Sequence, residues 1–134
     1  MTQLVPSNVY NQFAVEYDEW FDKHKSFYQS ELLAMKQSLP AQGKGIEIGV
    51  GSGRFAQPLN IKYGVEPSES MADIAKKRGV KIIHAIAENL PIDDQSYDFA
   101  TMVTTVCFLN DIPKAFSEVY RILKPNGEFI IGLI

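Results

Sequence analysis

The first part of the chain carries its apolar side chains at the spacing of an amphipathic helix. Over residues 9–39, aromatic and aliphatic side chains recur every three or four positions, which places them on one broad helical face. We expect Ser7 or Asn8 to cap the start of this segment, and a break at residues 23–26 to divide it into two helices. The face consists of Tyr10, Phe13, Tyr17, Trp20, Phe21, His24, Phe27, Tyr28, Leu32 and Met35.

From residue 45 onward, short apolar runs of the length of buried strands alternate with helical segments. We expect Ser68 and Asp111 to cap two helices that end near Arg78 and Leu123, and residues 87–90 to form a short turn of helix. Because strands that alternate with helices take right-handed crossovers, the pattern predicts an α/β fold with a doubly wound, mostly parallel sheet and helices on both faces. The expected strands are 45–49, 61–66, 80–85, 97–106 and 128–134.

Composition limits the classes of protein to which the chain can belong. With 134 residues, 46% hydrophobic and 22% charged, we expect one folded domain, made of a leading helical segment (1–40) and a core (43–134). The net charge of -3 argues against a nucleic-acid partner, and no apolar run is long enough to indicate a membrane partner. Cys107 is the single cysteine, which excludes an internal disulfide and fits a cytoplasmic location. No cluster of histidine, cysteine and carboxylate has metal-ligand spacing, so no metal is expected.

A glycine-rich turn follows the first expected strand, where residues 49–53 read Gly-Val-Gly-Ser-Gly. Glycines allow a close approach of backbone to ligand and a positive φ. Ligands of doubly wound sheets bind at the carboxyl ends of the strands, which is where this turn lies. A tight turn without any ligand is the alternative.

Dinucleotide binding is the nearest competing function for this turn, because residues 51–56 match the G-x-G-x-x-A form of such sites. Two features count against it. Pro58 leaves little helix after the turn, whereas a pyrophosphate needs a helix N-terminus. Glu47 lies just before the turn, and two like charges 4 Å apart repel by about 1–4 kcal/mol at a surface-like dielectric. S-adenosylmethionine (SAM) carries an ammonium and a sulfonium and no phosphate, so this carboxylate favours it.

Glu66 ends the second expected strand. An ionised carboxylate at this position can accept hydrogen bonds from both hydroxyls of a ribose. The same role exists in NAD sites, so Glu66 supports an adenosine ligand without choosing between SAM and NAD. A solvated charge at a strand end is the alternative for this residue.

Four segments, in the same order, resemble the motifs of class I (Rossmann-like) SAM-dependent methyltransferases. Residues 45–55 are similar to the first, glycine-rich motif, and residues 64–71 to the acidic second-strand motif. Residues 87–98 resemble the segment before the fourth strand, and residues 121–128 the turn into the fifth. The helix over residues 11–21 is similar to the leading helix of the small-molecule branch. The resemblance implies SAM as the cofactor, S-adenosylhomocysteine (SAH) as its product, and a five-stranded sheet of order 3-2-1-4-5.

The resemblance also implies which residues hold each half of SAM. Glu47 would order the ammonium, Tyr17 would close the pocket and Glu66 would bind the ribose, while Ile86 replaces an acidic residue that often reaches the adenine. The residues implied at the methionine and methyl end are Tyr17, Glu47, Gly49, Val50, Gly51, Gly53, Thr104 and Thr105. Those implied at the ribose and adenine end are Glu66, Pro67, Met71, Ala87 and Glu88.

The sheet of the family normally continues with two more strands, which this sequence lacks. The fifth strand would then be an apolar, exposed edge, and such an edge tends to pair with another chain. We therefore expect a homodimer or a higher oligomer, with that edge as one contact.

The expected activity is transfer of a methyl group from SAM to an N, O or S atom of a small-molecule acceptor. The sulfonium is already activated, so orientation and desolvation suffice and no catalytic dyad is required. The catalytic residues are unassigned, with Tyr17 and His24 as acceptor-side candidates. One alternative is a SAM- or SAH-binding module that is inactive because the last strands are missing. A nucleotide-binding oxidoreductase is another, disfavoured by Glu47 and Pro58.

Overall fold

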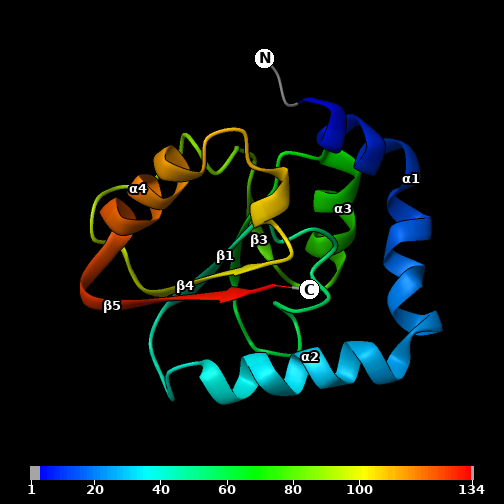
Figure 1. Ribbon diagram of the computed structural model, residues 1–134, viewed down its shortest axis with the longest axis horizontal. Coiled ribbons are helices and arrows are strands. Elements are labelled where there is room, and N and C mark those ends of the chain that lie inside the picture. Colours follow the sequence, from blue (N-terminus) through cyan, green and yellow to red (C-terminus); the bar gives the residue numbers. More distant parts are fainter. Residues whose placement is uncertain (1–3, 134) are drawn as a thin grey trace.

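Two helices lead into the sheet and meet at a sharp bend (Figure 1). The computed structural model describes residues 4–133, with side chains for residues 11–133. Helix α1 spans Leu4–Lys23 and helix α2 spans Lys25–Ser38. The predicted break is confirmed, because His24 leaves the helical conformation between them.

The start of α1 differs from the prediction. The helix already begins at Leu4, so Ser7 and Asn8 lie within it and do not cap it. Pro6 falls in the first turn, where its missing N–H costs no intrahelical hydrogen bond, and the helix therefore extends upstream of the polar pair. A kink interrupts α1 at Phe13, whose φ of -122° and ψ of 28° are not helical.

The sheet has five strands in the order β3-β2-β1-β4-β5, and every pair of neighbours is parallel. The predicted α/β class, strand order and number of strands are thereby confirmed. The parallel register places Glu47 of β1 between Gly64 of β2 and Thr101 of β4. The strands are β1 Gly45–Ile48, β2 Tyr63–Val65, β3 Lys81–Ile83, β4 Tyr97–Val103 and β5 Leu123–Gly132.

Several boundaries lie elsewhere than predicted. Strand β4 ends at Val103, because Thr104 adopts a left-handed φ of 58° that an extended strand cannot contain. Strand β5 pairs with β4 from Leu123 onward, across an irregularity in the register, and so begins before the predicted residue 128. Residues 87–90 form a turn and not a helix, since the Leu90 N–H donates to the side chain of Glu118 and not to a preceding carbonyl.

Two helices of the core begin at the predicted caps. Helix α3 spans Glu69–Lys77, and Ser68 Oγ accepts a hydrogen bond from the Met71 N–H. Helix α4 spans Ile112–Ile122, with Asp111 accepting from the N–H of Lys114. A short 3₁₀ helix, η1, occupies Val106–Phe108 after the fourth strand.

The helices cover both faces of the sheet (Figure 1). On one face, Ile46, Ile48 and Met102 pack in a cluster that includes buried residues of α4. On the other face, Phe99 packs with α3, and Val103 packs with α1 and α2. Because side chains alternate along a strand, Glu47 points to this second face. None of the helices within residues 4–133 has the length and apolarity that a bilayer span requires.

Candidate cofactor site

The glycine turn after β1 has the backbone conformation for which its glycines are needed. Gly49, Gly51 and Gly53 have φ angles of 75°, 58° and 85°. A Cβ on Gly49 would lie 2.6 Å from the side chain of Thr105, so this position also needs the missing side chain for space. Thr105 packs against the turn, and its Oγ1 lies 3.4 Å from the Gly49 carbonyl oxygen.

Turns and a bend, not a helix, follow the glycines over residues 51–60. Two helical-type hydrogen bonds are present, from the Gln57 N–H to Gly53 and from the Leu59 N–H to Phe55, each 3.1 Å long. The segment therefore lacks the helix N-terminus that a pyrophosphate would need, as Pro58 predicted.

Glu66 connects the turn to the end of β2. Its side chain is buried, Oε1 accepts from the Gly51 N–H at 2.8 Å, and Oε2 accepts from the Ser68 N–H at 2.9 Å. Burial raises the pKa of Glu66, while these two amide donors oppose the increase. The carboxylate therefore shapes the backbone of the site, and each oxygen keeps lone-pair capacity for a further donor.

Glu47 is a carboxylate under the turn, and one of its oxygens has no partner among the described residues. Glu47 is 2% exposed, and the oxygen in question is Oε1. Its neighbour in the register, Thr101, also has a buried hydroxyl without a partner. Burial first, and the Glu66 charge second, raise the pKa of Glu47 well above its ordinary value. A buried carboxylate of this kind is costly unless a cationic group pairs with it.

A pocket lies against Glu47, between the strand ends and α1. It brings together six of the residues predicted at the methionine end, while Gly53 and Thr105 lie outside its lining. The lining residues are Tyr17, Phe21, Glu47, Gly49, Val50, Gly51, Ser52, Arg54, Phe55, Val103 and Thr104.

The residues predicted at the adenine end are not in this pocket. Met71 is buried against the turn, with its Cε 3.2 Å from where a Cβ on Gly51 would lie. Ala87 is part of the hydrophobic core, and Glu88 Oε2 accepts from the N–H groups of residues 110 and 111. The Pro67 carbonyl accepts from the ring of His84 at 2.7 Å. The Glu88 side chain thus orders the loop before α4.

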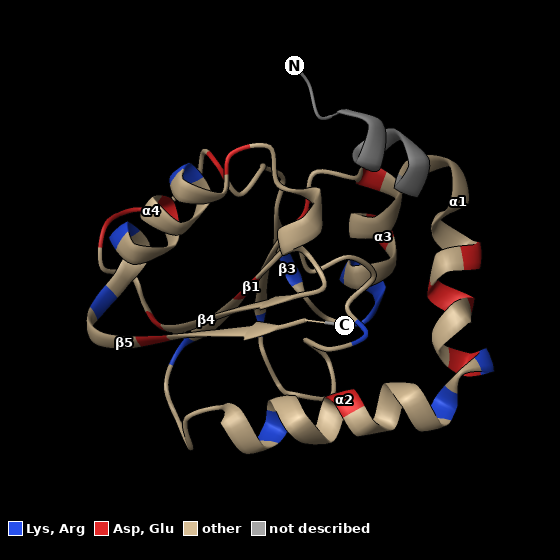
Figure 2. Cartoon of the chain, viewed as in Figure 1, with Lys and Arg blue, Asp and Glu red and all other residues tan. Residues whose placement is uncertain are grey.

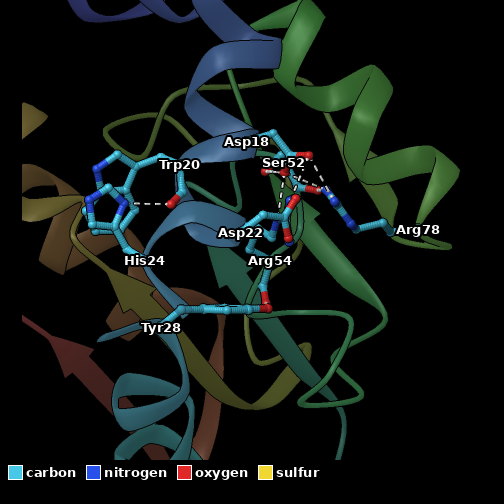
Figure 3. A network of polar contacts seen from close by, with 8 residues as sticks. All are labelled: Asp18, Trp20, Asp22, His24, Tyr28, Ser52, Arg54 and Arg78. Atoms are coloured by element: carbon cyan, nitrogen blue, oxygen red, sulfur yellow. Dashed lines mark hydrogen bonds and ion pairs between the residues drawn. The ribbon is translucent and has the colours of Figure 1, made fainter. Parts of the chain in front are cut away.

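The two acceptor-side candidates lie in different places. Tyr17 lines the pocket and packs edge-on against Phe21. His24 is exposed at the bend between α1 and α2 and is not part of the pocket lining. Its ring stacks on Trp20 with 4.1 Å between centroids, and its Nδ1 lies 2.9 Å from the Trp20 carbonyl oxygen (Figure 3).

Sequence reasoning missed a charged network beside the pocket. Asp18 of α1 accepts hydrogen bonds from Arg54, which follows the glycine turn, and from Arg78, which follows α3 (Figure 3). Asp22 of α1 accepts from Arg54. Figure 2 shows the acidic residues along α1 and basic residues at the end of α3. Two carboxylates four residues apart on the polar side of the leading helix were the available signal, since they share one face of a helix.

A protein-family description, "Methyltransferase domain", matches residues 46–131, from within β1 to within β5. The chain belongs to this methyltransferase family. Among solved structures, a Thermotoga maritima protein described as a SAM-dependent methyltransferase, possible histamine N-methyltransferase, is 56% identical to the methyltransferase domain. It superposes with a TM-score of 0.90 over 92% of this chain and 59% of that one.

Two curated relatives extend the comparison. An uncharacterised protein of Methanocaldococcus jannaschii is 48% identical over 127 residues, which are 95% of this chain and 62% of that protein. A Nostoc punctiforme protein named 2-phytyl-1,4-naphtoquinone methyltransferase is 30% identical over 152 residues, covering 98% of this chain and 64% of that protein. The methyltransferase domain thus spans less than two thirds of each relative. The predicted class I, Rossmann-like, SAM-dependent family is confirmed.

Proposed function

We propose that this methyltransferase domain binds SAM and transfers its methyl group to an N, O or S atom of a small molecule, leaving SAH. The observation that carries the proposal is the buried Glu47 Oε1, which has no partner among the described residues and borders the pocket. A ligand ammonium would supply the missing partner and offset the desolvation of the carboxylate. Thr101, beside it in the register, offers a second buried polar atom.

The glycine turn and Glu66 fit the rest of the cofactor. Without side chains, Gly49 and Gly51 leave their backbone open to the methionine part. Each Glu66 oxygen accepts one amide hydrogen bond and can accept one more, from a ribose hydroxyl. Met71 supplies an apolar contact next to Gly51.

Bound SAM supplies a methyl group already activated by its sulfonium. The chain's own residues then have to orient the cofactor and exclude water. Tyr17 and Phe21 form an aromatic wall of the pocket, which suits both tasks and offers ring faces to a cation. Tyr17 therefore stays the acceptor-side candidate that the pocket favours, while a role for His24 stays a prediction.

Charge distinguishes SAM from a dinucleotide as the ligand of this pocket. A pyrophosphate would meet the Glu47 carboxylate and no following helix, both unfavourable. The description of the Thermotoga protein names histamine, an amine, and the name of the Nostoc protein contains a quinone. Both names support a small-molecule acceptor. A SAM- or SAH-binding module without activity is the second candidate, because the chain spans only part of its relatives.

Calorimetric titration of the chain with SAM, SAH and NAD tests the proposal. We expect SAM and SAH to bind and NAD not to bind, and tight NAD binding without SAM binding would overturn the proposal. A transfer assay with methyl-labelled SAM and amine, phenol, thiol and carboxylate acceptors then separates the enzyme from the binding module. Methylation of none of them, together with SAM binding, would favour the module.

The predicted homodimer or higher oligomer and the cytoplasmic location stay predictions. Within the described residues β5 pairs with β4 alone, and Leu133 beyond its end is 74% exposed. Such an open edge supports pairing with a second chain. Light scattering on the purified chain measures the oligomeric state, and a monodisperse monomer would contradict the prediction.

A further inference from the structure

Two carboxylates of α1 are paired with two arginines from distant parts of the chain (Figure 3). Asp18 accepts from Arg78 Nη1 and Nη2 at 2.8 and 2.9 Å, and from Arg54 Nε and Nη2 at 2.8 and 3.2 Å. Asp22 accepts two hydrogen bonds from Arg54, both 2.9 Å long. Ser52 Oγ adds a donor to Asp18 at 2.6 Å. We call Asp18, Asp22, Arg54 and Arg78 the clasp.

The clasp is partly buried and balanced in charge. The side chains of Asp18 and Arg54 are 14% and 13% exposed, while Asp22 at the rim is 61% exposed. Burial opposes ionisation of Asp18, but hydrogen bonds from Arg78, Arg54 and Ser52 hold its pKa below the usual range. The two carboxylates are therefore charged at neutral pH, and they meet the two arginines in the bidentate geometry that makes such pairs strong.

The clasp holds a segment that is bounded by two breaks. Residues 14–23 lie between the kink at Phe13 and the bend at His24. This segment carries Tyr17 and Phe21 into the wall of the pocket. Glu47 is 2% exposed and lines the same pocket as this wall, so displacement of the segment would widen the way by which a ligand ammonium reaches it. The bonds of the clasp are the ionic contacts that oppose that displacement.

We infer that the clasp is a latch on the SAM pocket and that Arg78 is a positioning residue of this latch. Arg78 does not line the pocket. Arg78 acts through Asp18, which it holds against the glycine turn. Arg78 Nη1 also donates to the carbonyl of Ser52 in that turn, at 2.8 Å. Opening of the latch sets the rates at which SAM enters and SAH leaves. The inference rests on the proposed binding of SAM.

Stopped-flow binding to the Arg78→Gln variant tests the latch. Trp20 is the only tryptophan of the sequence, and its ring packs edge-on against Phe21 of the pocket wall at 5.3 Å, so its fluorescence reports on the wall. We expect the association and dissociation rate constants of SAM each to rise about fivefold, the change expected for a closed state weakened by the loss of one pair. Arg78→Lys, which keeps the charge, should restore part of the wild-type rates.

A change of charge alone and a damaged pocket would each produce a different pair of rate changes. If only the lost positive charge mattered, cationic SAM would associate faster and dissociate more slowly. If the pocket were merely damaged, SAM would associate more slowly and dissociate faster. Either of these results, or unchanged rates, would overturn the latch. Lys76→Gln removes the same charge from α3 at an exposed residue that pairs with Asp73, and it should leave both rates unchanged.

A second variant covers the case in which Arg78→Gln does not fold. Asp22→Asn removes the exposed half of the clasp and leaves Asp18 bound to both arginines. We expect a smaller rise in both rate constants, although the loss of a negative charge by itself would slow the association of cationic SAM. Unchanged or slower association would overturn the latch. Failure of the wild-type chain to bind SAM would instead overturn the proposed function.

Discussion

The backbone N–H of Gly51 donates to Glu66 Oε1 over 2.8 Å, so a single carboxylate joins the glycine turn to the end of β2. The other oxygen of Glu66 holds the N–H of Ser68, the cap of α3. The residue predicted to bind the ribose is therefore also part of the scaffold of the site. A substitution there is expected to change both the affinity for SAM and the stability of the fold.

Glu66→Ala should lower the affinity for SAM by roughly tenfold or more, a loss of about 1.4 kcal/mol or more of binding free energy. The free energy of unfolding should fall by about 1–3 kcal/mol, because the amides of Gly51 and Ser68 lose their acceptor. Calorimetric titration and urea unfolding measure the two effects. Glu69→Ala, at an exposed position in the first turn of α3, serves as the control and should leave SAM binding unchanged. An unaltered affinity in Glu66→Ala would refute the ribose contact.

Glu47→Gln should stabilise the ligand-free chain while weakening its binding of SAM. The glutamine keeps the shape of the side chain but removes an ionisable group whose buried Oε1 has no partner, and with it the cost of either burying the charge or taking up a proton on folding. We expect the free energy of unfolding at pH 7 to rise by about 1–3 kcal/mol, as neutralising an uncompensated buried group does. Urea unfolding measures this change, and the SAM titration should show weaker binding. A less stable Glu47→Gln variant would mean that the carboxylate is already compensated in the ligand-free chain.

The same carboxylate should make the binding of SAM depend on pH. Burial raises the pKa of Glu47, so in the ligand-free chain the charged form becomes populated only as the pH rises above the usual range of a glutamate. An ammonium prefers that charged form, and the affinity for SAM should therefore increase with pH across this range. Titrations at several pH values below that at which the SAM ammonium itself loses its proton measure the slope. Glu47→Gln should lose this slope, and equal slopes in both proteins would contradict the ammonium contact.

The strand order could be predicted from the family resemblance, and the two helix caps could be predicted because local patterns determine them. Ser68 and Asp111 each stand directly before an apolar helical run, and both prove to be caps. Prediction failed where contacts between distant residues decide. The turn at residues 87–90 has the composition of a helix, but Arg121 and Glu118 of α4 bind its backbone.

Some features of the site could likewise be predicted from the sequence, and others depend on contacts between distant residues. Glu47 and the glycine turn were found from their spacing, whereas the missing partner of Glu47 is a property of packing. Asp18 and Arg78 lie 60 positions apart in the sequence, a distance over which no local pattern links two charges. The clasp therefore became visible only in the structure.

Gly49→Ala should be more destabilising than Gly79→Ala, although both glycines have a positive φ. The two angles are 75° and 89°, so each alanine suffers backbone strain of about 1–2 kcal/mol. A Cβ on Gly49 would also lie 2.6 Å from Thr105, whereas a Cβ on Gly79 would meet nothing within 4 Å. Crowding of a packed site adds about 1–3 kcal/mol, and the turn would shift with it. Urea unfolding of the two variants gives the difference, and equal losses would show that the turn accommodates the added methyl group.

Glu118→Gln should remove part of the acid sensitivity of the fold. Glu118 accepts hydrogen bonds from Arg121 and from the Leu90 N–H, and these bonds, that from Arg121 above all, lower its pKa from 4.5 to about 2. Because the folded pKa is the lower one, the stabilisation is present above pH 4.5 and is lost as the pH falls toward 2. At pH 7 the variant should therefore be less stable than the wild type by about 1–2 kcal/mol, and near pH 2 the two should converge. Thermal unfolding across this range measures the convergence. Asp73→Asn, at an exposed pair, should leave the profile unchanged, and a constant gap for Glu118→Gln would disprove the linkage.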